Sequence, residues 1–397
     1  MPSGNEFLIS FVRSHDNACK NLHRLEKQIE RWLDMDYKDI EEFEQSQNSL
    51  DSLAPYVGKM RPELVKWLIE KFAYSQGIIY DPFSGSGTVL LEGWRSGYHV
   101  IGSDLNEYAI ILTKGKMNPY SDEQIALEKL ESYKPSVKRW INRNKEIQVP
   151  KWVNEFYHPE TLKEICAWMA ILKHNKEWFF LSCLLGILHH QRPGFLSYPS
   201  SHGAPYLRVN KYPKSEYPEM YEYREVYSRL KAKVSRMYRK FPKLDFSIVR
   251  EVYKKDATKI RFPERTIETI ITSPPYMKSL TYARDNRLRL WFLGVEDWKS
   301  LDKKISPERD YFYKEMTCCF KNWYKMQPVG GRCILVVGNL ETKYKGRKCS
   351  MPDALIEIAF PYYCLIEAYV DSIPEKRKVV KGDTKVKQEV VLVFERR

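Results

Sequence analysis

The feature that most constrains the fold is a short apolar run that ends in a glycine-rich turn and leads into a helix. Residues 78–80 form the apolar run, Gly85 and Gly87 lie in the turn, and a helical pattern begins at Val89. A strand, a glycine turn and a helix in this order bring the backbone close to a nucleotide-like ligand at the carboxyl edge of an α/β sheet. The sequence therefore predicts a parallel α/β sheet with a nucleoside-binding turn.

The turn does not match the two common phosphate-binding motifs. Leu90 stands where a dinucleotide fingerprint needs a third glycine, and no Gly-Lys-Ser/Thr sequence follows. A nucleoside without phosphates fits this pattern better. A second apolar run, residues 100–103, ends at Asp104. In folds of this kind such an acid hydrogen-bonds ribose hydroxyls.

A second segment carries polar and aromatic groups at the end of a predicted strand. The apolar run 267–271 is followed by Thr272 and then by Ser273, Pro274, Pro275 and Tyr276. Neither proline has an N–H, and each ring fixes φ, so the segment is stiff and presents carbonyl oxygens without competing donors. This arrangement suits a planar amino group that donates to Ser273 and to the Pro274 carbonyl while its ring stacks on Tyr276. A proline turn that merely closes a strand is the alternative.

Together the two segments resemble a known family. Residues 81–88 and 272–276 are similar to the cofactor and catalytic motifs of S-adenosylmethionine-dependent DNA amino-methyltransferases, specifically the N4-cytosine group of restriction-modification systems. Residues 55–65 resemble the family's cofactor-binding segment, and residues 282–294 resemble the segment after the catalytic loop. Residues 330–339 resemble a later core strand. The resemblance covers about residues 50–115 and 245–397.

The resemblance implies a cofactor and a set of site residues. The cofactor is S-adenosyl-L-methionine, and the catalytic residues are Ser273, Pro274, Pro275 and Tyr276. Asp256 resembles the acid that receives the adenine amino group. The residues expected to bind the cofactor are Tyr56, Lys59, Met60, Asp81, Pro82, Phe83, Ser84, Gly85, Ser86, Gly87, Thr88, Asp104, Leu105, Asp256, Ala257 and Thr272.

The implied fold is α/β: a Rossmann-like class I methyltransferase fold, with a mostly parallel twisted sheet closed by an antiparallel hairpin. Strands over 363–370 and 389–394 would form that hairpin. Residues 1–50 are expected to form a helical N-terminal extension, and residues 51–117 with 246–397 the catalytic domain. Residues 118–245 are expected to form a helical insert that recognises DNA. The basic residues 299–304 are expected to be irregular.

The charge of the chain indicates a polyanionic partner. Sixty-five Lys and Arg residues exceed 51 Asp and Glu residues, which gives a formal net charge of +14. Tyrosines interleave with Lys and Arg between residues 194 and 243, as expected where phosphates are gripped. Double-stranded DNA is the expected partner, contacted by Tyr206, Arg208, Lys211, Arg224 and Lys231. A solvated charged helix over 222–240 remains the alternative.

Methylation of an amino group buried in a duplex requires the base to be flipped out. The resemblance favours the N4 atom of cytosine, with N6 of adenine as the alternative. A DNA-binding protein of the same fold without activity is a third possibility. A cognate restriction endonuclease would act separately.

The remaining features argue for a reduced, metal-independent protein. The eight cysteines show no paired Cys-x-x-Cys spacing, and the adjacent His189 and His190 point about 100° apart on a helix. No metal is expected. No apolar run approaches the roughly 20 residues of a membrane span, and no signal peptide is evident at the start. We expect a cytoplasmic, nucleoid-associated protein that does not bind membranes.

Overall fold

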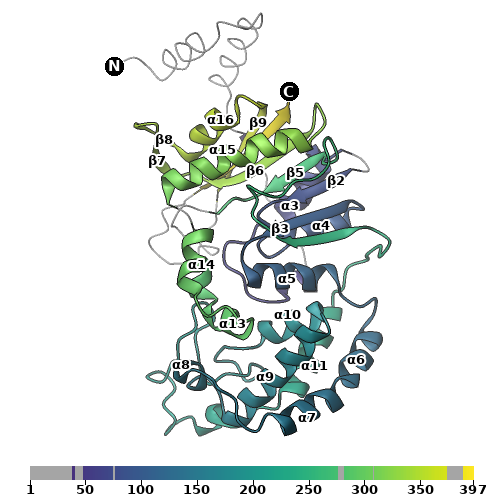
Figure 1. The fold of residues 1–397 in the computed structure, drawn as a ribbon, viewed down its shortest axis with the longest axis vertical. Helices are drawn as coiled ribbons and strands as arrows, with labels where there is room; N and C mark the ends of the chain where they lie inside the picture. Colours follow the sequence, from purple (N-terminus) through teal and green to yellow (C-terminus); the bar gives the residue numbers. More distant parts are fainter. Residues whose placement is uncertain (1–37, 41–47, 75–76, 276–280, 307, 373–387) are drawn as a thin grey trace, which may run out of the picture. The chain divides into compact units, whose positions relative to one another are not determined.

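The computed structural model describes residues 38–40, 48–74, 77–275, 281–306, 308–372 and 388–397 (Figure 1). The chain divides into two compact units. The first comprises Met1–Glu42, Arg261–Ile270 and Tyr313–Arg397, and the second comprises Phe43–Ile260 and Ile271–Phe312. The glycine-rich turn and the Ser273 segment therefore belong to the same unit.

Three parallel strands organise the second unit. They are β2 (Ile78–Asp81), β3 (His99–Asp104) and β4 (Arg250–Lys254), with β3 in the middle. The register pairs Ile79 with Val100 and Ile101 with Glu251. Parallel strands end at the same edge of a sheet, so the acids that close β2 and β3 lie along one edge.

Helices α3 (Pro62–Phe72), α4 (Thr88–Arg95) and α5 (Glu107–Met117) accompany these strands. Pro62 occupies the first turn of α3, where a missing N–H costs nothing. The Asn106 side chain caps α5 by accepting a hydrogen bond from the backbone N–H of Tyr108. Helices α4 and α5 begin shortly after β2 and β3 end, and the loops that join these strands to these helices form the site described below.

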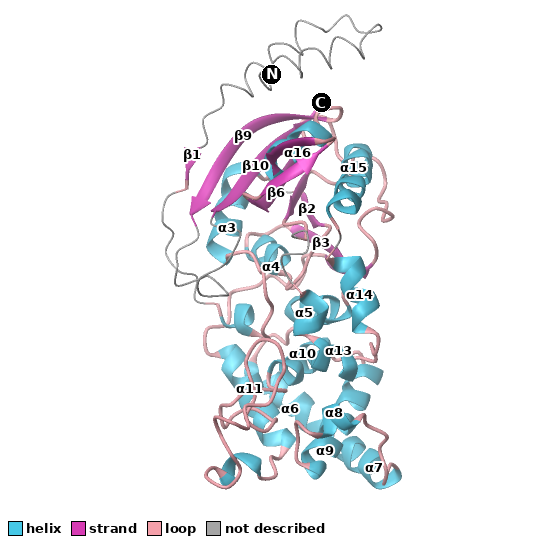
Figure 2. Cartoon of the chain, turned by 90° about the vertical axis from the view of Figure 1, so that its left-hand side faces the viewer, coloured by secondary structure: helices cyan, strands magenta, loops and turns pink. Residues whose placement is uncertain are grey.

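The insert is helical, as predicted, and Figure 2 shows α9, α10 and α11 in the same helical cluster. Its described α-helices are α6 (Glu123–Ser132), α7 (Lys134–Arg143), α8 (Lys151–Asn154), α9 (Pro159–His174), α10 (Trp178–Gly186) and α11 (Val226–Tyr238). The 3-10 turn η2 (Pro218–Tyr221) lies within the insert, and the 3-10 turn η1 (Ser49–Ser52) precedes it in the chain. The bounds of the insert, 118–245, remain a prediction.

Helix α10 packs tightly on α5, the helix that follows β3. A Cβ atom at Gly115 of α5 would lie 2.2 Å from Ser182 Oγ of α10, so no larger residue fits there without movement. Ser182 Oγ also donates a hydrogen bond of 2.9 Å to the carbonyl of Ile111. Residues 178–186 of α10 are almost all buried, which fits a helix that is covered on every side.

After the Ser273 segment the chain forms α12 (Tyr282–Asp285), α13 (Arg287–Phe292) and α14 (Trp298–Ile305). The prediction that residues 299–304 are irregular was wrong. Asp297 caps α14 by accepting from the Ser300 N–H, and Trp298, Leu301 and Ile305 recur at helical spacing.

The first unit contains an antiparallel hairpin. Its strands follow the order β1 (Lys38–Asp39), β9 (Tyr363–Ser372), β10 (Gln388–Arg396) and β6 (Arg332–Gly338), and β10 is antiparallel to both of its neighbours. Helix α15 (Arg309–Met326), helix α16 (Met351–Ala359) and the small hairpin of β7 (Glu341–Tyr344) and β8 (Arg347–Ser350) complete it. Strand β5 (Thr269–Thr272) runs from this unit into the second.

These observations confirm the fold class predicted from the sequence. Parallel β-α-β units with a glycine turn after the first strand, together with the antiparallel strand β10, form a Rossmann-like methyltransferase fold. Most of the predicted N-terminal helical extension lies outside the described residues, and its described part includes the short strand β1. Among the described helices, none has the length and apolarity needed to span a membrane.

Candidate active site

The glycine-rich turn follows directly from the end of β2. The Ser84 N–H donates to the carbonyl of Ser103 on β3 at 2.9 Å, and the Gly87 N–H donates to the Ser84 carbonyl at 2.6 Å. The turn is thereby folded against the neighbouring strand before α4 begins at Thr88. Ser84 Oγ is buried and has no hydrogen-bond partner among the described residues. A buried hydroxyl without a partner favours a ligand with a polar group at this place.

Asp104, at the end of β3, holds the turn from the other side. Its Oδ2 accepts from the Gly85 N–H at 2.9 Å, and its Oδ1 accepts from the Asn106 N–H at 2.8 Å. Burial raises the pKa of Asp104, although these backbone donors oppose the shift. Each carboxylate oxygen keeps a further lone pair, so Asp104 retains the capacity to accept ligand hydroxyls.

Gly87 adopts a conformation that only glycine tolerates here. Its φ is +75°, and an added Cβ would lie 2.9 Å from two side-chain atoms of Thr113. Gly97 has a similar φ of +87°, but nothing lies within 4 Å of its Cβ position. An alanine at either position would be strained by its positive φ, but only at Gly87 would it also overlap with a neighbouring side chain.

We expect Gly87→Ala to lower the free energy of unfolding by about 2–5 kcal/mol, because left-handed strain and overpacking add. Gly97→Ala, the matched control, should cost only about 1–2 kcal/mol. Urea unfolding of both variants measures the difference. Equal losses would show that Thr113 does not restrict this position.

The ring of Tyr56 covers the turn. A Cβ at Gly85 would lie 3.4 Å from Tyr56 Cε1, and the Tyr56 ring stacks on Tyr282 with centroids 6.2 Å apart. Burial, and then the charge of Asp104, raise the pKa of Tyr56 well above its ordinary value. Tyr56 therefore remains neutral and offers an aromatic face beside the glycine turn, and its contact with the cofactor stays a prediction.

The Ser273 segment lies beside the same turn. Thr272 Oγ1 donates a 2.6 Å hydrogen bond to Asp81 Oδ1, across 191 positions of sequence. Ser273 is half-buried and Pro274 is buried. Tyr276 lies outside the described residues. The end of β5 and the end of β2 thus converge, which brings the two sequence motifs together.

Asp81 is the most perturbed acid of this site. Burial raises its pKa to about 7, while the hydrogen bonds from Thr272 and from the Phe83 N–H partly offset the shift. A raised carboxyl pKa means that the folded state prefers the protonated form. The stability contributed by that proton is fully present below the pKa of the carboxyl group in the unfolded chain, near 4. It is lost as the pH rises through the folded-state pKa of about 7.

We therefore expect the wild type to lose stability relative to Asp81→Asn between pH 4 and pH 7, by up to roughly 4 kcal/mol. The asparagine keeps an acceptor oxygen for Thr272 and carries no charge at any pH. Urea unfolding of both proteins at pH 4.5 and pH 8 measures the change. An identical stability difference at both pH values would show that Asp81 titrates normally.

The other predicted cofactor residues fall into two groups. Pro82, Phe83, Ser86 and Thr88 are members of the turn: the Phe83 N–H donates to Asp81, the Pro82 carbonyl accepts from Ser103, and the hydroxyls of Ser86 and Thr88 lie 3.1 Å apart. Leu105 follows Asp104 directly. Asp256 and Ala257 follow β4, beside β3, and Asp256 Oδ1 accepts from the N–H and hydroxyl of Thr258 at 2.8 and 2.6 Å.

Lys59 and Met60 are less tied to the turn. Lys59 is exposed, and its ammonium group donates to the carbonyl of Asp51 at 3.0 Å. Met60 is half-buried. Their role in cofactor binding remains a prediction.

Three residues of this site were not singled out from the sequence. Asn106 caps α5, Tyr108 lies with its ring 5.9 Å from Tyr56, and Thr113 Oγ1 donates to the Gly85 carbonyl at 3.1 Å. Asn106 carries a usable signal, since an asparagine after a strand and before a helical pattern is a typical N-cap. Tyr108 and Thr113 reach the turn only through the packing of α5.

The donor and acceptor set fits S-adenosyl-L-methionine. The turn contains no lysine for phosphates, Asp104 offers acceptors for ribose hydroxyls, and Tyr56 provides an aromatic face. The buried hydroxyl of Ser84 lacks a partner, as noted above. S-adenosyl-L-methionine is the cofactor that these residues accommodate.

One predicted DNA contact needs correction. Arg224 is only 5% exposed, and its guanidinium donates to the carbonyls of Phe195, Ser197 and Met220. Burial lowers its pKa. Arg224 stabilises the insert from inside, so the prediction that it contacts DNA was wrong.

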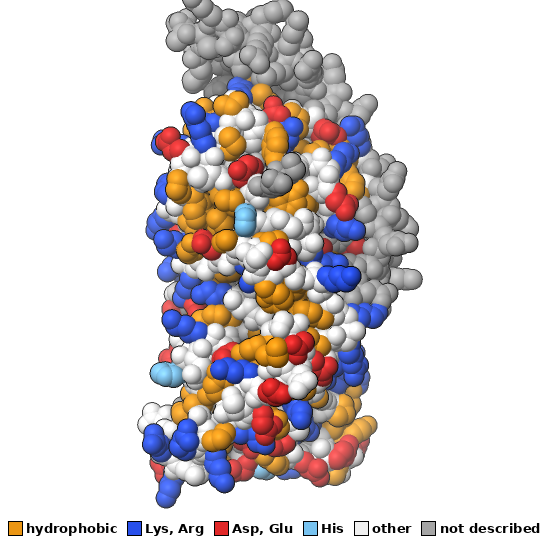
Figure 3. All heavy atoms as spheres, turned by 90° about the vertical axis from the view of Figure 1, so that its right-hand side faces the viewer, with side chains coloured by type: hydrophobic (Ala, Val, Ile, Leu, Met, Phe, Trp, Pro, Cys, Tyr) orange, Lys and Arg blue, Asp and Glu red, His pale blue; other side chains and the backbone are white. Residues whose placement is uncertain are grey.

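The other predicted DNA contacts reach the surface. Tyr206 is 54% exposed, Lys211 and Lys231 are exposed, and Arg208 donates to Gln191 at 2.7 Å while remaining half-buried. On the face drawn in Figure 3, Lys and Arg side chains are interspersed with Asp and Glu. The positive net charge is therefore not gathered into a single patch on that face, and the DNA contacts remain predictions.

The histidine pair does not form a metal centre. His189 is fully buried, and its Nδ1 lies 3.0 Å from the Ser201 carbonyl. In the part of the chain that the structure describes, no group of three or more His, Cys, Asp or Glu side chains is arranged to hold a metal ion.

A comparison with known protein families finds a match in the region that contains the glycine turn. Residues 5–115 match a protein-family model described as DNA methylase. This range includes Tyr56, the glycine turn and Asp104, and it also includes most of the region predicted as an N-terminal extension.

The chain is also similar to named type II methyltransferases. It is 29% identical over 127 residues to M.MjaII of Methanocaldococcus jannaschii, covering 32% of this chain and 21% of that protein. It is 36% identical over 74 residues to M.MvaI of Kocuria varians, covering 18% and 16%. It is 24% identical over 294 residues to M.BsoBI of Geobacillus stearothermophilus, covering 67% and 55%. The alignments thus span between 16% and 55% of the length of these relatives.

Proposed function

We propose that the protein is a DNA methyltransferase that transfers a methyl group from S-adenosyl-L-methionine to the N4 amino group of a cytosine flipped out of duplex DNA. The 2.6 Å hydrogen bond from Thr272 Oγ1 to Asp81 Oδ1 carries this proposal. It joins the segment suited to an amino group to the turn suited to the cofactor. The match of residues 5–115 to the DNA methylase family supports DNA as the substrate.

In this proposal, the turn and its neighbours bind the cofactor. Bound S-adenosyl-L-methionine supplies a methyl group on a positively charged sulfur. Asp104 accepts hydrogen bonds from the ribose hydroxyls with the lone pairs that its backbone hydrogen bonds leave free. Asp256 accepts a hydrogen bond from the adenine amino group. The Tyr56 ring, which lies against Gly85, contacts the cofactor with its face. These roles position the cofactor and require no metal-ligating group.

Ser273 and Pro274 act on the other reactant. The N4 lone pair of cytosine is delocalised into the ring, so the amino group must become pyramidal before it attacks. Ser273 Oγ and the Pro274 carbonyl oxygen accept hydrogen bonds from its two N–H groups. These bonds favour the pyramidal geometry through orientation and electrostatics. Tyr276 stacks on the flipped base. The same two acceptors stabilise the positive charge that develops on the nitrogen, and solvent then takes the proton.

The choice of base rests on Ser273. The resemblance that links the chain to amino-methyltransferases places Asp or Asn at this position more often in enzymes that act on adenine. A serine therefore favours cytosine. The named relatives are type II methyltransferases, and a separate restriction endonuclease would cut sites that this protein leaves unmodified. Tyr206, Arg208, Lys211 and Lys231 of the insert are proposed to contact the duplex.

The experiment that tests this proposal identifies the product. Purified protein is incubated with genomic DNA and S-adenosylmethionine carrying a labelled methyl group, and the DNA is digested to nucleosides. We expect label in N4-methylcytosine. Label in N6-methyladenine would overturn the base assignment, and absence of label from all nucleosides would overturn the enzyme assignment.

A further inference from the structure

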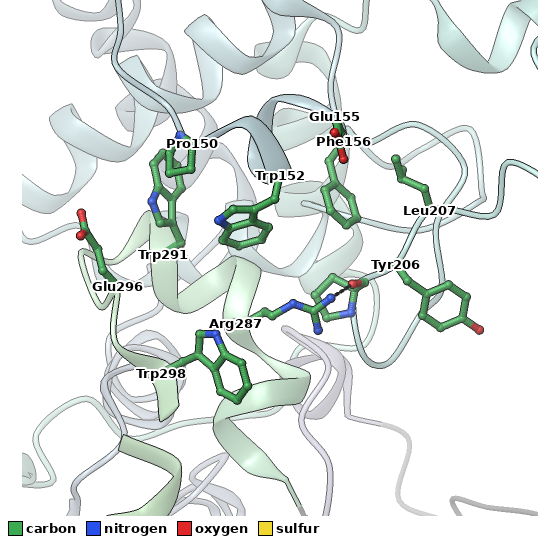
Figure 4. A pocket seen from close by; sticks show the side chains of 11 residues that line it. Pro150, Trp152, Glu155, Phe156, Tyr206, Leu207, Arg287, Trp291, Glu296 and Trp298 are labelled. Atoms are coloured by element: carbon green, nitrogen blue, oxygen red, sulfur yellow. Dashed lines mark hydrogen bonds between the residues drawn. The ribbon is translucent and has the colours of Figure 1, made fainter. Parts of the chain in front are cut away.

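A pocket of about 590 Å³ lies in the second unit, apart from the glycine turn and the Ser273 segment. Its volume is within the range of about 300–1,000 Å³ that is usual for small-molecule sites. Three separate segments line it: residues around α8, the loop 205–207, and the stretch from α13 to α14 (Figure 4). The residues used in the argument are Trp152, Trp291, Trp298, Arg287, Glu155 and Glu296.

Three tryptophans make the lining of the pocket strongly aromatic. Trp152, Trp291 and Trp298 are each only half-buried, although tryptophan is usually covered well in a folded protein. In Figure 4 the Trp152 and Trp298 rings lie on opposite sides of the Arg287 side chain. Half-exposed indole rings around one hollow offer flat faces, which bind a planar aromatic group by stacking.

The pocket is lined by one basic and two acidic residues. Arg287 donates to the carbonyl of Pro205 and, at 3.3 Å, to the carbonyl of Arg284. Burial lowers the pKa of Arg287, yet a guanidinium has five N–H groups, so donors remain for a ligand. Glu155 and Glu296 are exposed and are among the residues that line the pocket, to which they add negative charge. The pocket therefore combines stacking surfaces with fixed donors and charged acceptors.

From this arrangement we infer that the pocket holds an unpaired guanine of the DNA. Guanine is planar, presents O6 and N7 acceptors to arginine, and presents N1–H and N2–H donors to carboxylates. The inference rests on the proposed function, because removal of a cytosine from the duplex leaves its partner guanine unpaired. A pocket for that base would recover part of the cost of base flipping.

The first test uses deoxynucleoside monophosphates and needs no knowledge of the recognition sequence. Protein saturated with S-adenosylhomocysteine, which occupies the cofactor site, is titrated with dGMP, dAMP, dCMP and dTMP while tryptophan fluorescence is recorded. We expect saturable quenching with dGMP bound most tightly. Trp152→Ala should weaken dGMP binding about tenfold or more, and Trp152→Phe should restore most of it, because stacking needs a ring.

Trp140→Ala on α7 is the matched control, since Trp140 is also half-buried and lies outside the pocket. It should leave the dissociation constant for dGMP unchanged. Equal affinity for all four nucleotides, or an unchanged constant in Trp152→Ala, would overturn the inference. Methyl transfer measured on the same preparations distinguishes this failure from a failure of the proposed function.

The second test distinguishes a base of DNA from a free guanine nucleotide. The wild type is titrated with a duplex that carries one extrahelical guanine and with the same duplex fully paired. We expect tighter binding of the first, by about tenfold, and loss of that preference in Trp152→Ala. Tight binding of dGMP without any preference for the extrahelical guanine would overturn the assignment to DNA.

Discussion

Ser273→Ala should lower the rate of methyl transfer by roughly 10² or more while leaving the dissociation constant for S-adenosylmethionine nearly unchanged. The substitution removes an oriented acceptor that acts on the amino group in the transition state. The cofactor turn is untouched, because Thr272 and Asp81 keep their hydrogen bond. Single-turnover kinetics measures the rate, and calorimetry measures cofactor affinity.

Ser96→Ala is the matched control for this experiment. Ser96 is an exposed serine at the end of α4 in the same unit, and its loss should leave the rate within about twofold of the wild type, as usual for surface changes. A Ser273→Ala rate equally close to the wild type would remove this serine from the mechanism. An equal loss of rate and of cofactor affinity would indicate a structural role instead.

Asp104→Ala should weaken binding of S-adenosylmethionine by roughly 10²–10⁴. The carboxylate accepts two backbone N–H groups, and the proposed function adds the ribose hydroxyls. Each charge-assisted bond contributes about 1.5–3 kcal/mol, so the loss of two corresponds to about 3–6 kcal/mol. Alanine also leaves the Gly85 N–H without its acceptor. Isothermal titration calorimetry on cofactor-free protein measures the effect.

Asp104→Asn provides the internal comparison. Its amide oxygen still accepts one backbone N–H, whereas its NH₂ group faces the other donor, so an intermediate affinity is expected. Circular dichroism of both variants checks that the fold persists. Wild-type affinity in Asp104→Ala would place the ribose elsewhere in the site.

Local patterns predicted the elements that build the site. The apolar run before Asp81, the glycines after it and the helical pattern from Val89 all lie in a short stretch, and the structure confirms them as β2, the turn and α4. The hairpin of β9 and β10 was predicted for the same reason. Each of these elements depends on the periodicity and turn chemistry of adjacent residues.

Features that depend on tertiary packing were missed or misjudged. Arg224 was predicted at the surface because it lies in a basic stretch, yet three backbone carbonyls from the insert surround its guanidinium. The tryptophan pocket is assembled from segments around residues 150, 206 and 291, so no local pattern reveals it. The helix α14 is a different case, since its N-cap and apolar spacing were present in the sequence.

The close contact between Gly115 and Ser182 has a consequence for protein engineering. A chimaera that exchanged residues 118–245 for the recognition region of another enzyme would keep α5 and replace α10. The incoming helix would then have to meet Gly115 with an equally small residue, or it would separate from α5. Thr113, two positions away on α5, supports the Gly85 carbonyl, so a poorly fitting graft would also disturb the cofactor turn. A graft that leaves both α5 and α10 in place preserves that contact and the cofactor turn, so its first junction is better placed after α10.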